Sequence, residues 1–214
     1  MSNDDFNFEP IRGLPEMLPE DEHIIWQGAP RPLQLAREAW KLHWVMGYFV
    51  VLAVWRVGVS STTYPLTEAM GHGVPFLMSG LLACLILFGM AYVQARSTVY
   101  TLTNKRACLR IGAALTMTLN LPYVLIGNAH LATRRNGTGT LAFETLGETR
   151  ISYIMTWPHA RPWQIARCQP AFRAIPDAAA VAKLFAEAAE ARISTPQVAR
   201  IDPDQGAPTP VAAE

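Results

Sequence analysis

The chain contains 214 residues, half of them hydrophobic, and carries a formal net charge of +1 at pH 7. A balance this close to neutral argues against a nucleic-acid-binding protein, which needs an excess of basic residues to neutralise phosphates. The three cysteines (Cys84, Cys108 and Cys168) lie far apart without a CxxC pair, so the sequence supports neither a disulfide framework nor a zinc knuckle.

Acidic side chains dominate the first 30 residues. Only Arg12 opposes the acidic residues there, which are Asp4, Asp5, Glu9, Glu16, Glu20, Asp21 and Glu22. We therefore predict a solvated acidic arm over residues 1–30. Such a start differs from a secretory signal peptide, which begins with a basic patch and a hydrophobic run.

Two apolar stretches follow, at residues 42–60 and 74–95. The second has 22 residues without a charge, which is long enough for a helix to cross about 30 Å of hydrocarbon. The first is weaker because His43 and Arg56 lie near its ends, and an interfacial helix is the alternative for it. With the turn-forming residues 60–73 between them, the two stretches predict a transmembrane helical hairpin over residues 31–96.

Basic residues predict the orientation of this hairpin. They flank both outer ends, whereas the link at residues 60–73 has no Lys or Arg; the basic residues are Arg31, Arg37, Lys41, Arg96, Lys105 and Arg106. The positive-inside rule then places both termini in the cytoplasm, so we predict a multi-pass membrane protein. Aromatic residues near the expected interfaces agree with this placement, namely Trp40, Trp44, Tyr64 and Tyr92.

From Ser97 to Trp163 the pattern changes to short β-type runs separated by turns. Asn136-Gly137 is a strong hairpin signal, because both residue types tolerate positive φ angles. Several short strands at this spacing predict a small barrel or sandwich. The predicted strands are residues 98–103, 107–111, 115–121, 124–134, 140–145 and 151–157.

A helix is predicted at residues 177–193, with Asp177 as its N-cap. Val181, Leu184, Phe185 and Ala188 form one apolar stripe, which either caps the open end of the barrel or binds a partner. Pro, Ala and polar residues dominate residues 194–214, which we predict to be disordered. The expected fold is therefore an α+β membrane protein, a helical hairpin attached to a small β-domain that a C-terminal helix covers.

Several segments resemble membrane-anchored bacterial proteins with a pleckstrin-homology-like (PH-like) domain. Tyr100-Thr-Leu-Thr-Asn-Lys-Arg106, followed by Leu109-Arg-Ile-Gly112, is similar to the strand, polar turn and second strand that open this domain. Gly137-Thr-Gly-Thr-Leu141 is similar to its later hairpin. The resemblance implies a PH-like domain over residues 97–193.

More specific segments resemble the photosynthetic complex assembly proteins of purple bacteria. They are Trp26-Gln-Gly-Ala-Pro30, Trp157-Pro-His-Ala-Arg-Pro-Trp163, and Gln169-Pro170 with Ile175-Pro-Asp-Ala178. The resemblance runs from about residue 14 to residue 193. It implies a non-catalytic assembly factor in the bacterial inner membrane, including its photosynthetic intracytoplasmic part. The partners that it implies are reaction-centre subunits and core antenna polypeptides.

The segment Trp157 to Trp163 is the main candidate for partner contacts. Its two tryptophans, His159 and Arg161 offer the side chains that dominate interface energetics. The alternative is a proline-bent strand end that packs under the C-terminal helix. Arg134 and Arg135, beside the hairpin turn, are candidates for contacts with anionic headgroups or else belong to a solvated loop tip.

Other functions find less support in the sequence. A lone His43 or His130 is a weak candidate for a chlorin ligand, and we expect no metal and no cofactor. Nucleophile elbows, phosphate loops and metal boxes are missing from the sequence, so we expect no enzymatic activity. A membrane-anchored PH-like module that binds lipid or regulates is the alternative function.

Small residues around Gly80 and Cys84 permit close helix packing, either within the hairpin or in a homodimer.

Overall fold

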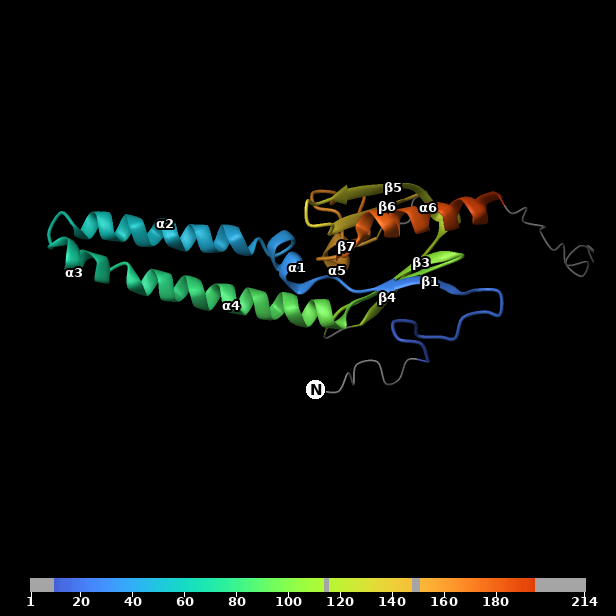
Figure 1. Cartoon of the computed structure of the whole chain (residues 1–214), viewed down its shortest axis with the longest axis horizontal. Coiled ribbons are helices and arrows are strands. Elements are labelled where there is room, and N and C mark those ends of the chain that lie inside the picture. Colours follow the sequence, from blue (N-terminus) through green and yellow to red (C-terminus); the bar gives the residue numbers. More distant parts are fainter. Residues whose placement is uncertain (1–9, 114–115, 148–150, 195–214) are drawn as a thin grey trace, which may run out of the picture.

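The computed structural model describes residues 10–113, 116–147 and 151–194. A pair of long helices extends from one end of a β-rich domain, as Figure 1 shows. The tail that we predicted to be disordered, residues 195–214, lies outside the described residues. The start of the acidic arm, residues 1–9, lies outside them as well.

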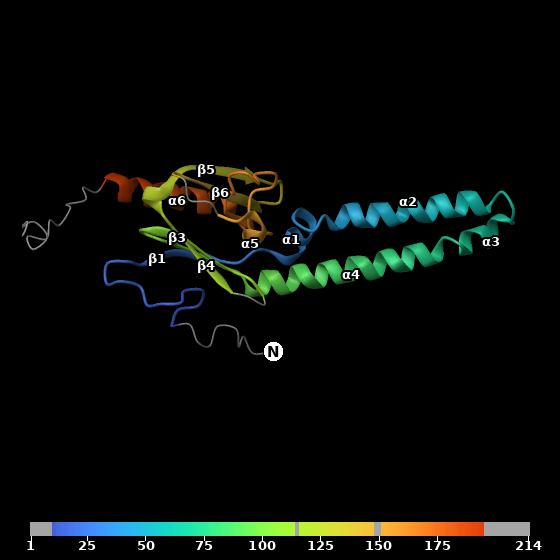
Figure 2. The ribbon, with the colours of Figure 1, turned by 180° about the vertical axis from the view of Figure 1, so that it is seen from behind.

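The long helices are α2 (Leu42–Ser60) and α4 (Val74–Ser97), joined by the short helix α3 (Leu66–Gly71). They run side by side in opposite directions, which both views show (Figures 1 and 2). The segments Leu42–Ser60 and Leu66–Ser97, the second of which includes α3 and α4, are long and apolar enough to cross a membrane. Only 6% of the most apolar part of the first and 11% of that of the second is buried within the molecule. Gly80 permits their close approach, since a Cβ there would lie 2.6 Å from Cβ of Phe49. The sequence did not predict α3.

The first sheet has four antiparallel strands in the order β1-β2-β3-β4. They are β1 (Ile24–Gly28), β2 (Val99–Thr103), β3 (Arg106–Ile111) and β4 (Met117–Pro122). Strand β1 comes from the stretch that we predicted to be a solvated arm. Acidic residues beside it pair with the β2–β3 turn, since Glu22 is buried and its Oε1 lies 2.8 Å from Nε of Arg106.

The second sheet has three antiparallel strands in the order β5-β6-β7. They are β5 (Ile126–Thr133), β6 (Gly139–Thr145) and β7 (Ala171–Ile175), and the short helix η2 (Tyr123–Leu125) connects β4 to β5. The turn between β5 and β6 lies at Asn136-Gly137, as predicted, and Gly137 has a φ of +77°.

Helix α6 (Ala178–Ser194) closes the domain core between the two sheets. Its stripe of Val181, Phe185 and Ala188 is buried, and the Phe185 ring lies 5.4 Å from that of Tyr123 and 5.1 Å from that of Phe143. The stripe therefore covers the core. The prediction of a barrel is wrong, because within the described residues the sheets remain separate and do not close on each other.

Two further differences concern short segments. Residues 151–157 were predicted to be a strand, but Tyr153–Thr156 forms the one-turn helix α5, in which Thr156 N donates to Ser152 O at 3.1 Å. A short apolar run does not distinguish a strand from a buried helical turn. Strand β7 and the helix α1 (Pro32–Glu38), which precedes α2, were not predicted from the sequence.

Candidate functional site at the base of the helical pair

Helix α1 attaches the helical pair to the domain. Its residues Leu35 and Ala36 are fully buried, and Leu35 packs with Ala95 of α4 and Ala174 of β7. The chain entering α1 is fixed as well, since Arg31 N donates to Ala174 O at 2.9 Å. One short helix therefore contacts both a long helix and the second sheet.

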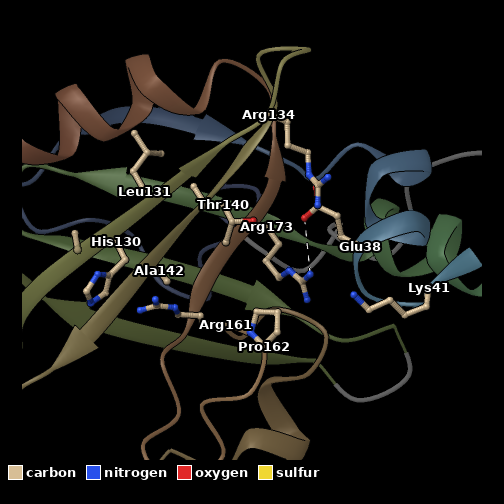
Figure 3. A pocket seen from close by; sticks show the side chains of 12 residues that line it. Glu38, Lys41, His130, Leu131, Arg134, Thr140, Ala142, Arg161, Pro162 and Arg173 are labelled. Atoms are coloured by element: carbon tan, nitrogen blue, oxygen red, sulfur yellow. Dashed lines mark hydrogen bonds and ion pairs between the residues drawn. The ribbon is translucent and has the colours of Figure 1, made fainter. Parts of the chain in front are cut away.

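Ion pairs strengthen this attachment. The Glu38 carboxylate, at the end of α1, is only 7% exposed, and its Oε1 accepts a hydrogen bond from Nε of Arg134 at 2.6 Å. Its Oε2 lies 3.8 Å from Nη2 of Arg173, a β7 residue that is 4% exposed. A buried carboxylate needs such partners because it has lost its hydration. Figure 3 shows Glu38 between the two guanidinium groups.

A buried polar network lies next to these pairs. His159 is fully buried, with Nδ1 at 2.5 Å from the Tyr100 hydroxyl and Nε2 at 3.2 Å from Oγ1 of Thr98. The Tyr100 hydroxyl accepts a hydrogen bond from Arg173 N at 3.2 Å, so its own proton is left for Nδ1 of His159. The imidazole then carries its proton on Nε2, which donates to Thr98.

Burial sets the charge states in this network. It lowers the pKa of His159 to about 3, with a smaller effect in the same direction from the positive charge of Arg173. Burial also raises the pKa of the Tyr100 hydroxyl. Both groups are therefore neutral near pH 7, and their hydrogen bonds connect strands β2 and β7 with the segment after α5.

Residues 157–170 form a loop with a closed base, which we call the Trp loop. At its base Ala171 N donates to His159 O and Arg161 N donates to Gln169 O, both at 2.8 Å. Trp157 packs edge-on against Trp40, which follows α1, with ring centroids 4.7 Å apart. The base of the loop is thus hydrogen-bonded to the start of β7 and packs against Trp40, between α1 and α2.

The tip of the Trp loop projects into solvent. Trp163 is 86% exposed and Ile165 is 68% exposed. Trp163 also has a φ of +67°, a left-handed conformation that costs a bulky residue about 1 kcal/mol or more. Helix α5, just before the loop, exposes Ile154 and Met155 in addition. Large exposed apolar side chains held on a rigid base are typical of an interaction surface.

A cavity of about 500 Å³ opens beside the Trp loop, between the end of α1 and the second sheet. It is lined mostly by polar and basic residues, and Figure 3 shows Lys41, Arg161 and Arg173 directed into it. The full lining is Glu38, Lys41, Ala129, His130, Leu131, Ala132, Arg134, Thr140, Ala142, Arg161, Pro162 and Arg173.

The structure separates the residues that were predicted to bind a partner. Trp163 is on the surface, Trp157 is 37% exposed and packs on Trp40, and Arg161 bonds to Gln169 Oε1 at 2.9 Å. His159 is withdrawn from the predicted partner surface, because it is fully buried and cannot touch another molecule.

The two predicted headgroup residues differ as well. The Arg134 guanidinium is half exposed but paired with Glu38, which ties it to α1. Arg135 lines a second cavity, of about 670 Å³, which continues the first one past Glu38 and Lys41. A chlorin or metal site at His130 stays untested, although the His130 ring lies 3.1 Å from the Glu144 carboxylate and, among the described residues, no three potential ligands gather.

Sequence reasoning missed the residues that hold this site together. Glu38 and Arg173 lie in short elements with no motif, and Tyr100 belongs to a motif that indicated only the family. The partners of these residues are 59 to 135 positions away in the chain. One signal was present. An Arg in the middle of the apolar run AFRAI at residues 171–175 has to be paired if that run is buried.

Comparison with known proteins agrees with this architecture. The Bacterial PH domain family matches residues 45–189, which include both long helices and most of the domain, so the chain belongs to this family. This match confirms the prediction of a PH-like domain.

The comparison also finds one similar protein from Rhodobacter capsulatus, a photosynthetic bacterium. It is called "Uncharacterized 23.7 kDa protein in puhA 5'region" and is 41% identical over 218 residues, which cover 99% of this chain and all of the relative. No solved structure matches the chain.

Proposed function

We propose that this protein is a non-catalytic assembly factor for the photosynthetic reaction centre and core light-harvesting complex. It corresponds in this proposal to PuhB, the assembly protein of purple bacteria that the sequence resembles. It acts through protein–protein contacts, with reaction-centre subunits and core antenna polypeptides as partners.

The whole-length similarity to the Rhodobacter capsulatus protein is the observation that carries the proposal. The name of that relative places it in the 5' region of puhA, and 41% identity over 99% of the chain leaves no segment of the fold unmatched. The segments resembling PuhB, at Trp26 to Pro30 and at the Trp loop, lie within this matched length.

The two long helices support a role in the membrane. Their apolar side chains face outward, and examples are Trp55, Leu82 and Leu85 with exposed fractions of 72%, 60% and 58%. Such a surface is costly in water and favourable in hydrocarbon. We propose that α2 and α4 cross the bacterial inner membrane, including its photosynthetic intracytoplasmic part, and that the domain and both termini are cytoplasmic.

The arrangement at the base of the helices suits an assembly factor. Helix α1 and the His159 network fix the orientation of the domain relative to the helical pair, so the tip of the Trp loop is held at the end of the domain next to the helices (Figure 1). A partner that packs against α2 or α4 in the bilayer could then contact Trp163 and Ile165 at the same time.

Deletion of the gene in a photosynthetic host tests the proposal directly. Near-infrared absorption of the membranes should show reduced reaction-centre and core-antenna bands, and a plasmid-borne copy should restore them. Unchanged bands in the deletion strain would refute the assembly role.

The topology can be tested separately by labelling single cysteines in whole cells. A Cys at position 163 should react with a membrane-impermeant maleimide only after the cells are broken. A Cys at position 64, in the link between the long helices, should react in intact cells once the outer membrane is permeabilised. The reverse pattern would place the domain outside the cytoplasm.

A further inference from the structure

The cavity beside the Trp loop has an excess of positive charge. Lys41, Arg134, Arg161 and Arg173 line it, whereas Glu38 is the only carboxylate among its lining residues. The neighbouring cavity shares Glu38, Lys41 and Arg134 and adds Arg37 and Arg135. Six basic side chains therefore surround one carboxylate, and the carboxylate is already engaged by Arg134 at 2.6 Å.

Arg173 is the buried member of this cluster, and its bonding is incomplete. Nη1 donates to Pro158 O at 3.0 Å, but Nη2 is 3.8 Å from Glu38 and Nε has no partner among the described residues. Burial lowers the pKa of the Arg173 guanidinium, and the nearby Glu38 carboxylate offsets only part of this decrease. A charged group that is 4% exposed and underpaired is costly unless an anion completes its bonding.

The position of the cavity indicates where such an anion would come from. Lys41 directly precedes α2, whose first residue is Leu42, so the basic cluster lies at the root of the apolar helical pair. In Figure 3, Lys41 extends from this root toward Arg173. If α2 and α4 cross the bilayer, the cavity lies at the depth of the phospholipid headgroups on the side of the domain.

We propose that this cavity binds the headgroup of an anionic phospholipid, with Lys41, Arg161 and Arg173 contacting its phosphate. Guanidinium groups match a phosphate through paired N–H donors, and an ammonium adds a mobile positive charge. The lipid would fill the space between α1 and the second sheet and so couple the domain to the membrane. The inference rests on the proposed insertion of the helices but not on the assembly role.

Native mass spectrometry of the full-length protein tests this site. The detergent-solubilised protein is mixed with equal amounts of phosphatidylglycerol and phosphatidylcholine, and the fraction carrying one lipid is measured. Phosphatidylglycerol should be bound preferentially, and the double variant Lys41→Gln/Arg161→Gln should reduce its apparent affinity roughly tenfold, as expected for lost charge-assisted hydrogen bonds. Arg173→Gln is a second variant, which is used only if it remains folded.

Arg167→Gln is the matched control, because Arg167 lies on the same loop, is exposed, and does not line the cavity. It should bind phosphatidylglycerol like the wild type. Equal binding of both lipids, or unchanged binding by the double variant, would overturn the proposal. Equally tight binding of inorganic phosphate would also overturn it and would indicate a soluble ligand. Displacement of the bound lipid by an acidic peptide, but not by phosphatidylcholine, would overturn it in favour of a protein partner.

Resistance of the wild-type protein to carbonate extraction from membranes separates the two levels of failure. If the protein stays in the membrane but shows no lipid preference, the cavity proposal is wrong and the membrane placement stands. If it is extracted as a soluble protein, the placement itself is wrong.

Discussion

The base and the tip of the Trp loop differ sharply although they belong to one short motif. At the base, His159 is fully buried and hydrogen-bonded on both ring nitrogens, whereas at the tip Trp163 is 86% exposed. Only the tip can serve as a partner surface, because a substitution at the base would first disturb the fold. The motif therefore combines a structural anchor with a presented surface.

Removal of Glu38 should have the largest effect on the base. Glu38→Ala leaves the buried guanidinium of Arg173 without its carboxylate, and breaking a buried pair in this way costs about 3 kcal/mol. Thermal unfolding in detergent should show a clearly lower midpoint. Glu187→Ala, which removes an exposed i,i+4 partner of Lys183, is the control and should change stability by about 0.5 kcal/mol or less. Equal effects of the two changes would contradict the anchoring role of α1.

Tyr100→Phe should have the next largest effect. The change deletes the hydroxyl between His159 Nδ1 and Arg173 N and leaves both buried groups without a partner, at a cost of about 2 kcal/mol. Tyr48→Phe, on an exposed side chain of α2, is the control. A stability like that of the wild type, measured by the same unfolding assay, would show that the network is dispensable.

Acidification should lower the stability of the base of the Trp loop, where His159 lies, before it affects the tip. His159 has its pKa lowered to about 3 in the fold but titrates near 6.5 when unfolded, so below pH 6.5 the unfolded state binds the extra proton. The contribution of His159 to the free energy of unfolding is complete above pH 6.5. It falls by at most about 1.4 kcal/mol per pH unit as the pH drops toward 3.

The comparison of unfolding midpoints at pH 7 and at about pH 5.5 isolates this effect, because most carboxylates stay ionised in that interval. His159→Gln should be less stable at pH 7 but should lose less on acidification than the wild type does. An identical loss in both proteins would assign the pH dependence to other histidines.

Trp163→Ala should have the smallest effect on stability. The side chain is exposed, so its loss should change the free energy of unfolding by about 0.5 kcal/mol or less in either direction. Trp157→Ala, by contrast, removes the contact with Trp40 and should be clearly destabilising. Similar stabilities for both variants would contradict the distinction between base and tip.

How far the sequence could predict this molecule depends on the range of the interactions. Apolar runs and local turn chemistry identify α2, α4, α6 and the β5–β6 turn, because these features depend on neighbouring residues. Strand β1, helix α1 and strand β7 were missed, since each is short and is stabilised by partners far away in the chain. The sequence pattern likewise could not show that the two sheets remain open.

The candidate site shows the same limit. The sequence singled out Trp163, which the structure places on the surface, and His159, which it buries. Nothing local distinguishes the two, because their environments depend on β2 and β7. Glu38 and Arg173 were not singled out, because the cavity that both residues line exists only once α1 packs against the second sheet.

The most direct test of the account is complementation of the deletion strain with Trp163→Ala/Ile165→Ala. We expect the variant to accumulate in the membrane at the wild-type level, yet to leave the near-infrared reaction-centre and core-antenna bands as low as in the deletion strain. Ile193→Ala, an equally exposed isoleucine near the end of α6, should restore them. Full restoration by the double variant would contradict the claim that the tip of the Trp loop is the surface through which this protein assembles its partners.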